Sequence, residues 1–356
     1  MRILFAVCSW GLGHIMRSLP IIRELSKENK IFVVTHGRSL TAAKENLKDF
    51  PNIEFIDLPD YPLPYTKNPF LFLPKFVSYI PEILHNIKKE HQYIEKIIRT
   101  ENIKLIISDT RYGIYSNSKK INSYFITNQL KYIAPFRMTL LTEFFNSLFQ
   151  KKFKKILIPD FPEFESSLSG ELNHNLKFFN RNKLVYYGII SNYKKIEVKE
   201  DIDVFFSISG PEPQRTVFEN LILSQAKKLD KKIVISLGTP EKKFFREENN
   251  IKVYSYLSEE KREEILNRSK IVVSRSGYST IMDLAELEKK AFFIPTKYQT
   301  EQEYLVRFHL KQGNCYFKDQ EKINLESDLK EAEKYRGLKA KWKTKKSINI
   351  FLENLF

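Results

Sequence analysis

The sequence predicts an α/β protein built from two Rossmann-like domains that face a central cleft. Three observations favour this class. Short β-rich runs alternate with helical patterns along most of the 356 residues, and such alternation is typical of parallel βαβ units. One polar, charged segment, 191–201, interrupts the alternation. The chain is also longer than the roughly 250–300 residues at which a single core usually stops growing.

These observations divide the chain into four regions. We expect an N-terminal Rossmann-like domain over residues 1–190, a linker over 191–201 and a second Rossmann-like domain over 202–340. Residues 341–356 are basic at first and then apolar at helical spacing. They predict a C-terminal helix that packs back on the N-terminal domain.

The individual elements follow from periodicity. In the first half, β-rich runs predict strands at 2–9, 31–36, 53–58, 105–109, 124–128, 156–159 and 184–188. Helical spacing predicts helices at 14–28, 40–50 and about 74–99. In the second half we expect strands at 203–209, 233–237, 253–256, 271–275 and 292–295, and helices at 211–229, 259–268, 279–288 and 300–311. Ser258 caps the helix at 259–268, whose first turn carries acidic residues where the helix dipole favours them.

Composition excludes several classes. Hydrophobic residues make up 42% of the chain, which excludes a disordered or fibrous protein. The longest apolar runs are strand-sized, far below the ~18 residues of a membrane span. Residues 1–9 form a strand pattern, so no secretory signal is expected. Cys8 and Cys315 lie far apart, without metal-ligand spacing, which predicts neither disulfides nor a zinc site. We expect a reduced, cytoplasmic protein.

Charge points to anionic partners. Lys and Arg number 59 against 43 Asp and Glu, a net charge of +16. Nucleic acid, an anionic membrane face and phosphorylated substrates all fit this excess.

The turn after the first strand carries the first candidate site. It reads Cys8-Ser9-Trp10-Gly11-Leu12-Gly13-His14, and its glycines let a ligand approach the backbone at a helix start. A dinucleotide fingerprint would need a third glycine where Met16 stands, and no acidic residue ends the second strand. The phosphate-loop pattern is also absent, so neither an NAD oxidoreductase nor a P-loop NTPase is favoured.

His14 is the candidate base of this turn. At a helix start the dipole favours the neutral imidazole, which can accept a proton. The alternative is a histidine that only caps the helix. Arg17 lies one turn further on the same face, where it either holds an anion or forms an ion pair.

Two glycine turns in the second half have a similar design. Ser209 and Gly210 follow one strand, and Arg275-Ser276-Gly277-Tyr278-Ser279-Thr280 follows another, with Asp283 one turn into the helix. Small hydroxyl residues and a glycine at a helix start suit a diphosphate, and a carboxylate suits ribose hydroxyls. Either turn alone could be an ordinary βα connection.

Together these residues resemble family 28 glycosyltransferases of the GT-B fold, among them the N-acetylglucosamine transferase of lipid II synthesis. The resemblance is carried by Gly11-Leu12-Gly13-His14 with Arg17, by 275–280 with Asp283, and by the run 209–216. It spans nearly the whole chain and is strongest from 203 to 313.

The resemblance implies an inverting, metal-independent transfer from a UDP-sugar, with no cofactor. Gly11, Gly13, His14 and Arg17 would lie on the acceptor side. The donor side would consist of Ser209, Gly210, Arg275, Ser276, Gly277, Tyr278, Ser279, Thr280, Asp283, Gln302 and Glu303. Glu303 departs from the glutamine pair that contacts the donor sugar in the family.

The expected enzyme is therefore a hexosyltransferase that moves a sugar, with N-acetylglucosamine as one candidate, to a lipid-linked or envelope glycan acceptor. His14 is the first choice for the base and Asp109, at the end of a predicted strand, is the second. Two alternatives stay open. One is a nucleotide-sugar hydrolase or epimerase on the same fold. The other is a nucleic-acid-binding protein, which is disfavoured because no recognised binding module is found.

Two aromatic stretches, 61–79 and 136–155, suggest the acceptor's location. The second mixes Phe144, Phe145 and Phe149 with several lysines. A basic helix with aromatic residues on its other face can lie on an anionic membrane. Peripheral contact with the inner face of the cytoplasmic membrane is thus one option, and a core-facing helix with a solvated cationic side is the other.

Overall fold

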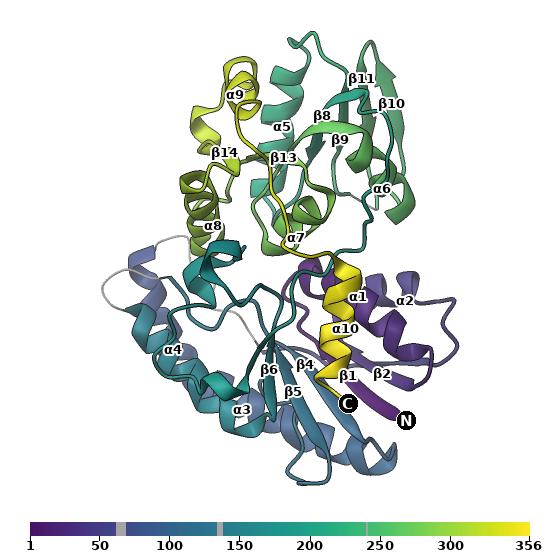
Figure 1. Ribbon diagram of the computed structural model, residues 1–356, viewed down its shortest axis with the longest axis vertical. Coiled ribbons are helices and arrows are strands. Elements are labelled where there is room, and N and C mark those ends of the chain that lie inside the picture. Colours follow the sequence, from purple (N-terminus) through teal and green to yellow (C-terminus); the bar gives the residue numbers. More distant parts are fainter. Residues whose placement is uncertain (62–68, 134–137, 240) are drawn as a thin grey trace. The chain divides into compact units, whose positions relative to one another are not determined.

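A computed structural model describes residues 1–61, 69–133, 138–239 and 241–356. These residues form two compact units (Figure 1). Unit 1 consists of Met1–Ile190 together with Trp342–Phe356, and unit 2 consists of Ser191–Lys341. Each unit contains a mostly parallel sheet with helices. The predicted α/β class with two Rossmann-like domains is confirmed.

The sheet of unit 1 has the order β3-β2-β1-β4-β5-β6-β7, and every neighbouring pair is parallel. Its strands are β1 (Arg2–Val7), β2 (Lys30–Thr35), β3 (Ile53–Asp57), β4 (Leu105–Asp109), β5 (Asn122–Ile126), β6 (Lys155–Ile158) and β7 (Leu184–Tyr186). The order reverses between β1 and β4, which is where open α/β sheets bind their ligands.

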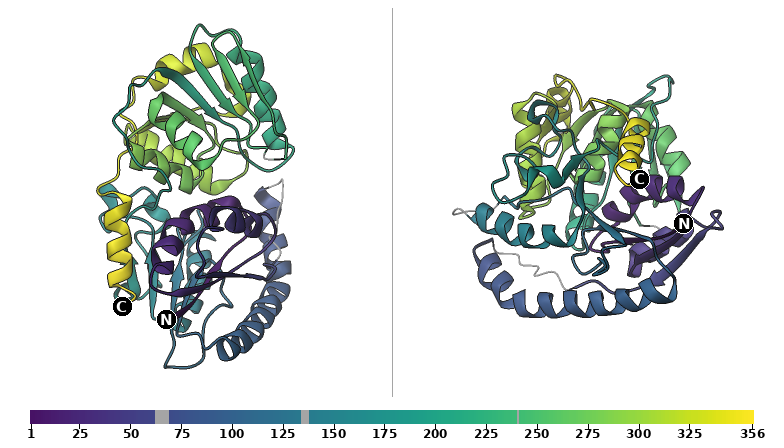
Figure 2. Two further views of the ribbon diagram at one scale, coloured as in Figure 1. Left: turned by 90° about the vertical axis from the view of Figure 1, so that its right-hand side faces the viewer. Right: turned by 60° about the horizontal axis from the view of Figure 1, so that its bottom comes forward.

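The helices of unit 1 cover both faces of this sheet (Figure 2). They are α1 (Leu12–Ser26), α2 (Gly37–Asn46), α3 (Pro69–Thr100), α4 (Met138–Leu148) and α10 (Thr344–Glu353), with short 3-10 turns at Phe149–Lys152, Phe164–Ser166, Gly170–Leu172 and Arg181–Lys183. Alternate residues of β1 point to opposite faces. Ile3 and Phe5 pack with α1 and α10, whereas Leu4 packs with Ile94 and Ile98 of α3.

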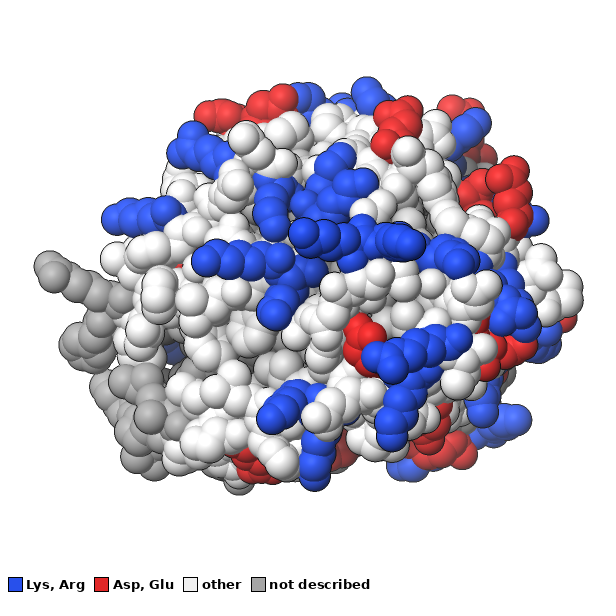
Figure 3. All heavy atoms as spheres, turned by 90° about the horizontal axis from the view of Figure 1, so that it is seen from below, with Lys and Arg blue, Asp and Glu red and all other residues white. Residues whose placement is uncertain are grey.

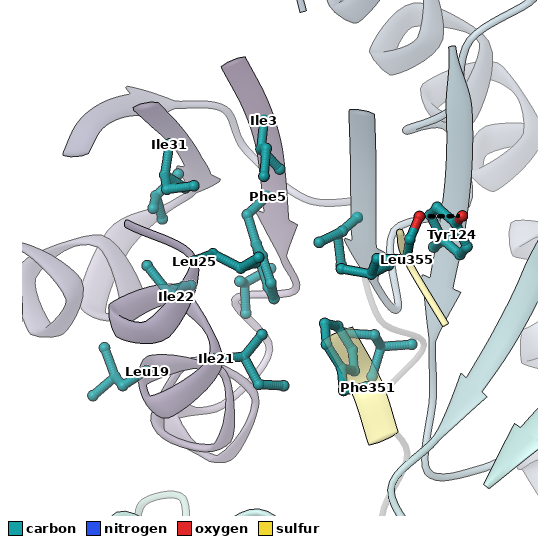
Figure 4. Close-up of a cluster of buried hydrophobic side chains, with 14 of the residues drawn as sticks. Ile3, Phe5, Leu19, Ile21, Ile22, Leu25, Ile31, Tyr124, Phe351 and Leu355 are labelled. Atoms are coloured by element: carbon teal, nitrogen blue, oxygen red, sulfur yellow. Dashed lines mark hydrogen bonds between the residues drawn. The ribbon is translucent and has the colours of Figure 1, made fainter. Parts of the chain in front are cut away.

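The C-terminal helix belongs to the core of unit 1. Phe351 is fully buried, and Figure 4 shows it with Leu355 beside residues of β1 and α1. The Tyr124 hydroxyl donates to the Leu355 carbonyl at 3.0 Å. Trp342 donates its indole N–H to the Tyr187 carbonyl at 3.3 Å. A Cβ on Gly188 would lie 2.2 Å from that indole nitrogen, so only glycine fits there, at φ +91°.

Unit 2 contains a sheet in the order β10-β11-β9-β8-β12-β13-β14, parallel except for the antiparallel edge pair β10–β11. Its strands are β8 (Ile202–Ser207), β9 (Ile233–Ser236), β10 (Phe245–Glu248), β11 (Ile251–Tyr254), β12 (Ser269–Ser274), β13 (Lys290–Phe293) and β14 (Cys315–Phe317). Its helices are α5 (Gln214–Ala226), α6 (Glu259–Arg268), α7 (Tyr278–Leu287), α8 (Thr300–Lys311) and α9 (Leu325–Ala332), with a 3-10 turn at Gln320–Lys322.

Three elements of unit 2 were not predicted from the sequence. Every residue of β10 is exposed and three of its four are charged, so it has no apolar alternation to detect. The strand β14 has only 3 residues and α9 only 8. Helix α5 was predicted to begin at Pro211 but begins at Gln214, because Pro213 occupies its N-cap.

The segment 191–201 contains no helix or strand and packs on unit 2. The backbone N–H of Ile196 donates to the Asn267 side chain at 2.9 Å. Lys289 donates to Glu200 at 2.6 Å, and Arg268 holds Asp201 with two bonds of 2.8 Å. The predicted linker is therefore an extended strip bound to α6 and to the strand starts.

Candidate active site

The first candidate site lies where the strand order of unit 1 reverses. α1 begins directly after β1, and β4 lies beside β1 with Val7 opposite Asp109. Gly11 is the N-cap of α1, and no side chain caps that helix. The topology therefore brings His14, in the first turn of α1, to the end of β4, 95 residues further along the chain.

His14, Asp109 and Arg17 form one hydrogen-bonded cluster. His14 Nδ1 lies 2.9 Å from Asp109 Oδ1. Arg17 donates from Nε to Asp109 Oδ2 at 2.9 Å and from Nη2 to Oδ1. Its third nitrogen, Nη1, donates to Asn128 Oδ1 at 2.6 Å. His14 and Asp109, the two candidates for the base in the sequence analysis, thus form a hydrogen-bonded pair. Arg17 is bonded to the carboxylate of that pair.

Asp109 is fully buried and stays ionised. Burial by itself would raise the pKa of its carboxyl group, but the Arg17 guanidinium and His14 hold the pKa well below its usual range. Ser18 and Thr110 add hydroxyl donors at 3.2 and 3.0 Å. A carboxylate with this many donors is a fixed acceptor for a histidine N–H.

His14 keeps one nitrogen free. Its side chain is 22% exposed, and Nε2 has no hydrogen-bond partner among the residues described. With Nδ1 at the carboxylate, Nε2 is the atom that can accept a proton from a bound hydroxyl.

The glycine turn before His14 leaves open space and is hydrogen-bonded to a neighbouring segment. A Cβ on Gly11 would meet no atom within 4 Å, and Gly13 is half-buried in the first turn of α1. Ser9 donates its N–H and its hydroxyl to Asp60 Oδ2, and the Trp10 indole N–H donates to the Tyr61 carbonyl at 3.0 Å. These bonds tie the turn to the segment after β3.

A second histidine–carboxylate contact lies after β6, where Asp160 Oδ2 is 3.5 Å from His174 Nε2. Asp160 also accepts hydrogen bonds from Ser167, Ser169 and three backbone N–H groups. Because its oxygens are saturated within one loop, this pair braces the loop.

The second candidate site lies where the strand order of unit 2 reverses, between β8 and β12. Ser209 and Gly210 follow β8, and Arg275 follows β12. Gly210 has φ +125°, a conformation that disfavours any side chain. A Cβ placed on it would lie 3.9 Å from Arg275 Nε. The two glycine turns singled out from the sequence therefore lie side by side.

Arg275 is buried without a counter-charge. Its guanidinium donates to the carbonyls of Ile294 and Pro295 at 3.0 and 3.1 Å and to Gln320 at 2.6 Å. Within the described ranges no carboxylate lies within 4 Å of it, and its Nε is buried without a hydrogen-bond partner. Burial lowers the pKa of Arg275 to about 10. An uncompensated buried cation is costly, and a bound anion would offset that cost.

The N-terminus of α7 provides backbone donors next to this cation. Gly277 is the N-cap and has open space around its Cα, and no side chain caps the helix. Ser279 and Thr280 are half-buried in the first turn. Tyr278 and Ser276 are buried, and Ser276 donates its hydroxyl to the Gln302 carbonyl at 3.1 Å.

Asp283 is hydrogen-bonded within the protein. Ser191 Oγ donates to its carboxylate at 2.6 Å. Burial raises the pKa of Asp283 to about 7, opposed by the Ser191 hydrogen bond and the charge of Arg262. Because this pKa lies near 7, a ligand that donates hydrogen bonds to the carboxylate would favour its ionised form.

Gln302 and Glu303 both bond backbone at the start of α8. Gln302 accepts from the Thr296 N–H at 2.8 Å and is buried, and Glu303 accepts from the Tyr298 N–H at 3.0 Å. The structure thus places them in the β13–α8 turn, where Glu303 also lies 4.0 Å from Arg307.

The sequence analysis did not identify two residues that bond to the candidate sites. Asn128 holds Arg17, and Arg262 of α6 donates to the Ser207 hydroxyl at the end of β8. Neither residue is part of a glycine turn, so no local signal marked it. No three His, Cys, Asp or Glu side chains gather to hold a metal ion in the parts of the chain described.

Comparisons with known proteins agree with this architecture. Residues 213–351 match the model of the glycosyltransferase family 28 C-terminal domain. No protein of curated function matches the chain by sequence.

Among solved structures, the glycosyltransferase of kitacinnamycin is 12% identical with a TM-score of 0.63, covering 99% of this chain and 94% of that one. MurG from Acinetobacter baumannii is 13% identical with a TM-score of 0.57, covering 99% of both chains. A Listeria monocytogenes protein described as a UDP-N-acetylglucosamine 2-epimerase is 12% identical with a TM-score of 0.62, covering 99% and 94%.

The domain match shows that residues 213–351 resemble the family 28 C-terminal domain, and the structural matches show that the chain has the GT-B fold. The resemblance inferred from the glycine turns is confirmed at that level.

Proposed function

We propose that the protein is an inverting, metal-independent glycosyltransferase that moves a sugar from a UDP-sugar to a lipid-linked or envelope glycan acceptor. The observation that carries this proposal is the His14–Asp109 pair with its 2.9 Å contact and its free Nε2. The family 28 C-terminal domain supports a nucleotide-sugar donor.

His14 acts as the base in this proposal. Its Nε2 takes the proton of the acceptor hydroxyl as the oxygen bonds to the anomeric carbon of the donor. The bond between that carbon and the diphosphate oxygen breaks, and UDP leaves with the electron pair. Asp109 keeps the proton on Nδ1 and stabilises the imidazolium that forms, as carboxylates do in histidine-based catalysis.

Arg275 and the start of α7 stabilise the departing diphosphate. The buried guanidinium without a counter-charge and the uncapped helix N-terminus both favour negative charge. Asp283 accepts from the ribose hydroxyls, and Gln302 with Glu303 contacts the sugar. N-acetylglucosamine is the candidate sugar because the motifs resemble those of the lipid II enzyme.

An exposed apolar face on unit 1 supports a membrane-bound acceptor. Leu141, Phe144 and Leu148 lie at helical spacing on α4, and Phe178 packs edge-to-face against Phe144 with ring centroids 5.4 Å apart. These four side chains, here called the α4 face, are between 42% and 56% exposed. Of the first aromatic stretch, residues 62–68 and the side chains of 69–77 lie outside the described part.

Hydrogen bonds hold the Phe178 side of the α4 face, and exposed lysines lie close to it in sequence. The buried Glu143 accepts from the Phe178 N–H at 2.8 Å, and Gln150 donates to the Phe178 carbonyl at 3.0 Å. Lys151, Lys152 and Lys177 are exposed nearby in sequence. In the view from below in Figure 3, Lys and Arg side chains gather in a band, although the view does not mark which element carries them. Exposed apolar side chains on a chain with a net charge of +16 fit an anionic lipid surface at the inner face of the cytoplasmic membrane. No helix of the described residues is long and apolar enough to cross a bilayer.

The base is tested with His14→Ala. Turnover should fall by about 10²–10⁴, the usual contribution of a general base, while UDP affinity measured by calorimetry stays near wild type. His36, an exposed histidine 2.7 Å from Asp57, provides the matched control. Equal activity of His14→Ala and His36→Ala would remove His14 from catalysis.

The membrane contact is tested with Phe144→Ser in vesicle co-sedimentation. Binding to phosphatidylglycerol vesicles should weaken about tenfold or more, since burial of one aromatic side chain contributes about 1.5–3 kcal/mol. Phe245→Ser, on the exposed edge strand of unit 2, is the control. Binding that responds equally to both substitutions, or that is absent from the wild type, would contradict the proposal.

Nucleotide-sugar hydrolysis or epimerisation is a second candidate, since the Listeria epimerase has the same fold at a TM-score of 0.62. Product analysis with and without acceptor separates the two. A free sugar or an epimer formed without acceptor would favour the second candidate.

A further inference from the structure

We infer that Arg17 is a positioning residue that sets the protonation of the His14–Asp109 pair. The inference deepens the proposed function, because it concerns the same base, and it has a readout that needs no activity. Arg17 is 6% exposed and uses three nitrogens within this cluster. A side chain so enclosed has little surface with which to bind an acceptor directly.

Two polar atoms lie beside His14 Nδ1, and the tautomer of the ring decides which of them it bonds. Asp109 Oδ1 and Arg17 Nη2 each lie 2.9 Å from that nitrogen. If Nδ1 carried a lone pair, it would accept from Arg17 Nη2 but would also face an ionised oxygen. If Nδ1 carries the proton, it donates to Oδ1, which also accepts from Arg17 Nη2. The second arrangement pairs the N–H with the ionised oxygen and leaves the lone pair on Nε2, which is the tautomer that the proposed base requires.

Arg17 also balances the charge around the imidazole. Among the residues described, the titratable groups that interact electrostatically with Asp109 of the pair include Arg17 from α1, Cys8 from the end of β1 and Tyr187 after β7. Burial raises the pKa of the Cys8 thiol and of the Tyr187 hydroxyl, so both stay neutral at working pH. The negative charge of the Asp109 carboxylate and the positive charge of the Arg17 guanidinium then offset each other. Asp109 therefore orients His14, while Arg17 offsets part of the attraction between the carboxylate and the imidazolium.

Neighbouring groups hold Arg17 in this position. Asn128 accepts from Arg17 Nη1 at 2.6 Å, and its own carbonyl accepts from Asn173 Nδ2 at 2.7 Å. Asn173 Nδ2 also lies 2.9 Å from Ser169 Oγ in the loop braced by Asp160. The chain of bonds runs from α1 past β5 to the loop after β6, so the guanidinium is pre-organised.

The test compares Arg17→Gln with the wild type by NMR titration of the histidine ring protons. The protein has 6 histidines, and the His14 signal is assigned as the one absent from His14→Gln. Without the guanidinium, the carboxylate is no longer balanced. The titration midpoint of His14 should therefore rise by about 1–2 pH units, as expected for a charge removed at this distance with partial screening. The acid limb of the pH–rate profile should shift by the same amount, with activity recovered at high pH.

Two further variants separate charge from structure. Arg17→Lys keeps the charge but cannot bridge both carboxylate oxygens, so its midpoint should stay within about half a unit of wild type. Arg111 is an equally buried arginine of unit 1, paired with Glu90 at 2.7 Å and Asp60 at 3.0 Å. Arg111→Gln should lower stability and leave the His14 midpoint unchanged.

The outcomes are distinct. An unchanged midpoint in Arg17→Gln, or an equal shift in Arg111→Gln, overturns the inference. If Arg17→Gln does not fold, Asn128→Leu, which frees one nitrogen of the guanidinium, must show a smaller shift in the same direction. If no acceptor supports turnover, the proposed function fails while the NMR titration still decides the role of Arg17.

Discussion

Asp283→Asn should make the protein more stable at alkaline pH while weakening nucleotide binding. The carboxylate accepts a 2.6 Å hydrogen bond from Ser191, and burial raises the pKa of Asp283 to about 7. An acid whose pKa is higher in the folded than in the unfolded chain binds its proton more tightly when folded. Its contribution to stability is therefore present at low pH and is lost as pH rises from about 4 through 7.

The size of the effect follows from that shift. The difference between the ordinary value of 3.8 and about 7 corresponds to at most about 4 kcal/mol. Because the side chain is half-buried, water still solvates the carboxylate in part, and about 1–2 kcal/mol is the realistic expectation. Asparagine retains an acceptor for Ser191 and carries no charge. At pH 8 the variant should thus exceed the wild type in free energy of unfolding by that amount, and at pH 5 the two should be close.

Urea denaturation at pH 5, 6.5 and 8 measures the stability difference, and calorimetry with UDP measures the binding loss. Loss of a charge-assisted hydrogen bond to ribose should weaken UDP binding by about 1–3 kcal/mol. A stability difference that does not change with pH would refute the burial argument. Unaltered UDP affinity would remove Asp283 from the donor site, whatever the stability shows.

Two other predictions concern the packing of the C-terminal helix and the independence of turnover from metal ions. Phe351→Ala should destabilise unit 1 by about 3–5 kcal/mol in urea denaturation, because it empties a fully buried position. Phe356→Ala, at a side chain 68% exposed, should change little, and equal effects would place α10 outside the core. Turnover should survive EDTA, since no described group of three side chains could hold a metal ion. Loss of activity that Mg²⁺ or Mn²⁺ restores would contradict metal independence.

Much of the fold was readable from local patterns. Strands such as β1 and β4 are continuous apolar runs, and α6 has Ser258 as its cap with acids in its first turn, so their positions followed from periodicity and capping. The elements that escaped are short or lack an apolar face. Phe245–Glu248 becomes a strand because it pairs with β11, a reason that lies outside its own four residues.

The candidate site divides in the same way. Glycines before His14 and before Tyr278 marked the turns, because few residues other than glycine suit a ligand's close approach at a helix start. No local sequence pattern identified the residues that bond to these turns from elsewhere in the chain. Asn128 and Arg262 are ordinary polar residues until the sheet places them beside Arg17 and Ser207.

The amino-acid sequence alone determined that the chain forms two α/β units and that their glycine turns lie at strand ends, since these properties depend on neighbours within one or two helical turns. It presented His14 and Asp109 as rivals for one role. Only the tertiary structure made them partners, because the strand order β2-β1-β4 sets the end of β4 beside the start of α1. The order of strands in a sheet is decided by how whole helices pack on its faces, and no local pattern records it. The same packing buried Arg17 against Asp109, so that of the two roles expected for it, an anion site or an ion pair, the structure shows the ion pair.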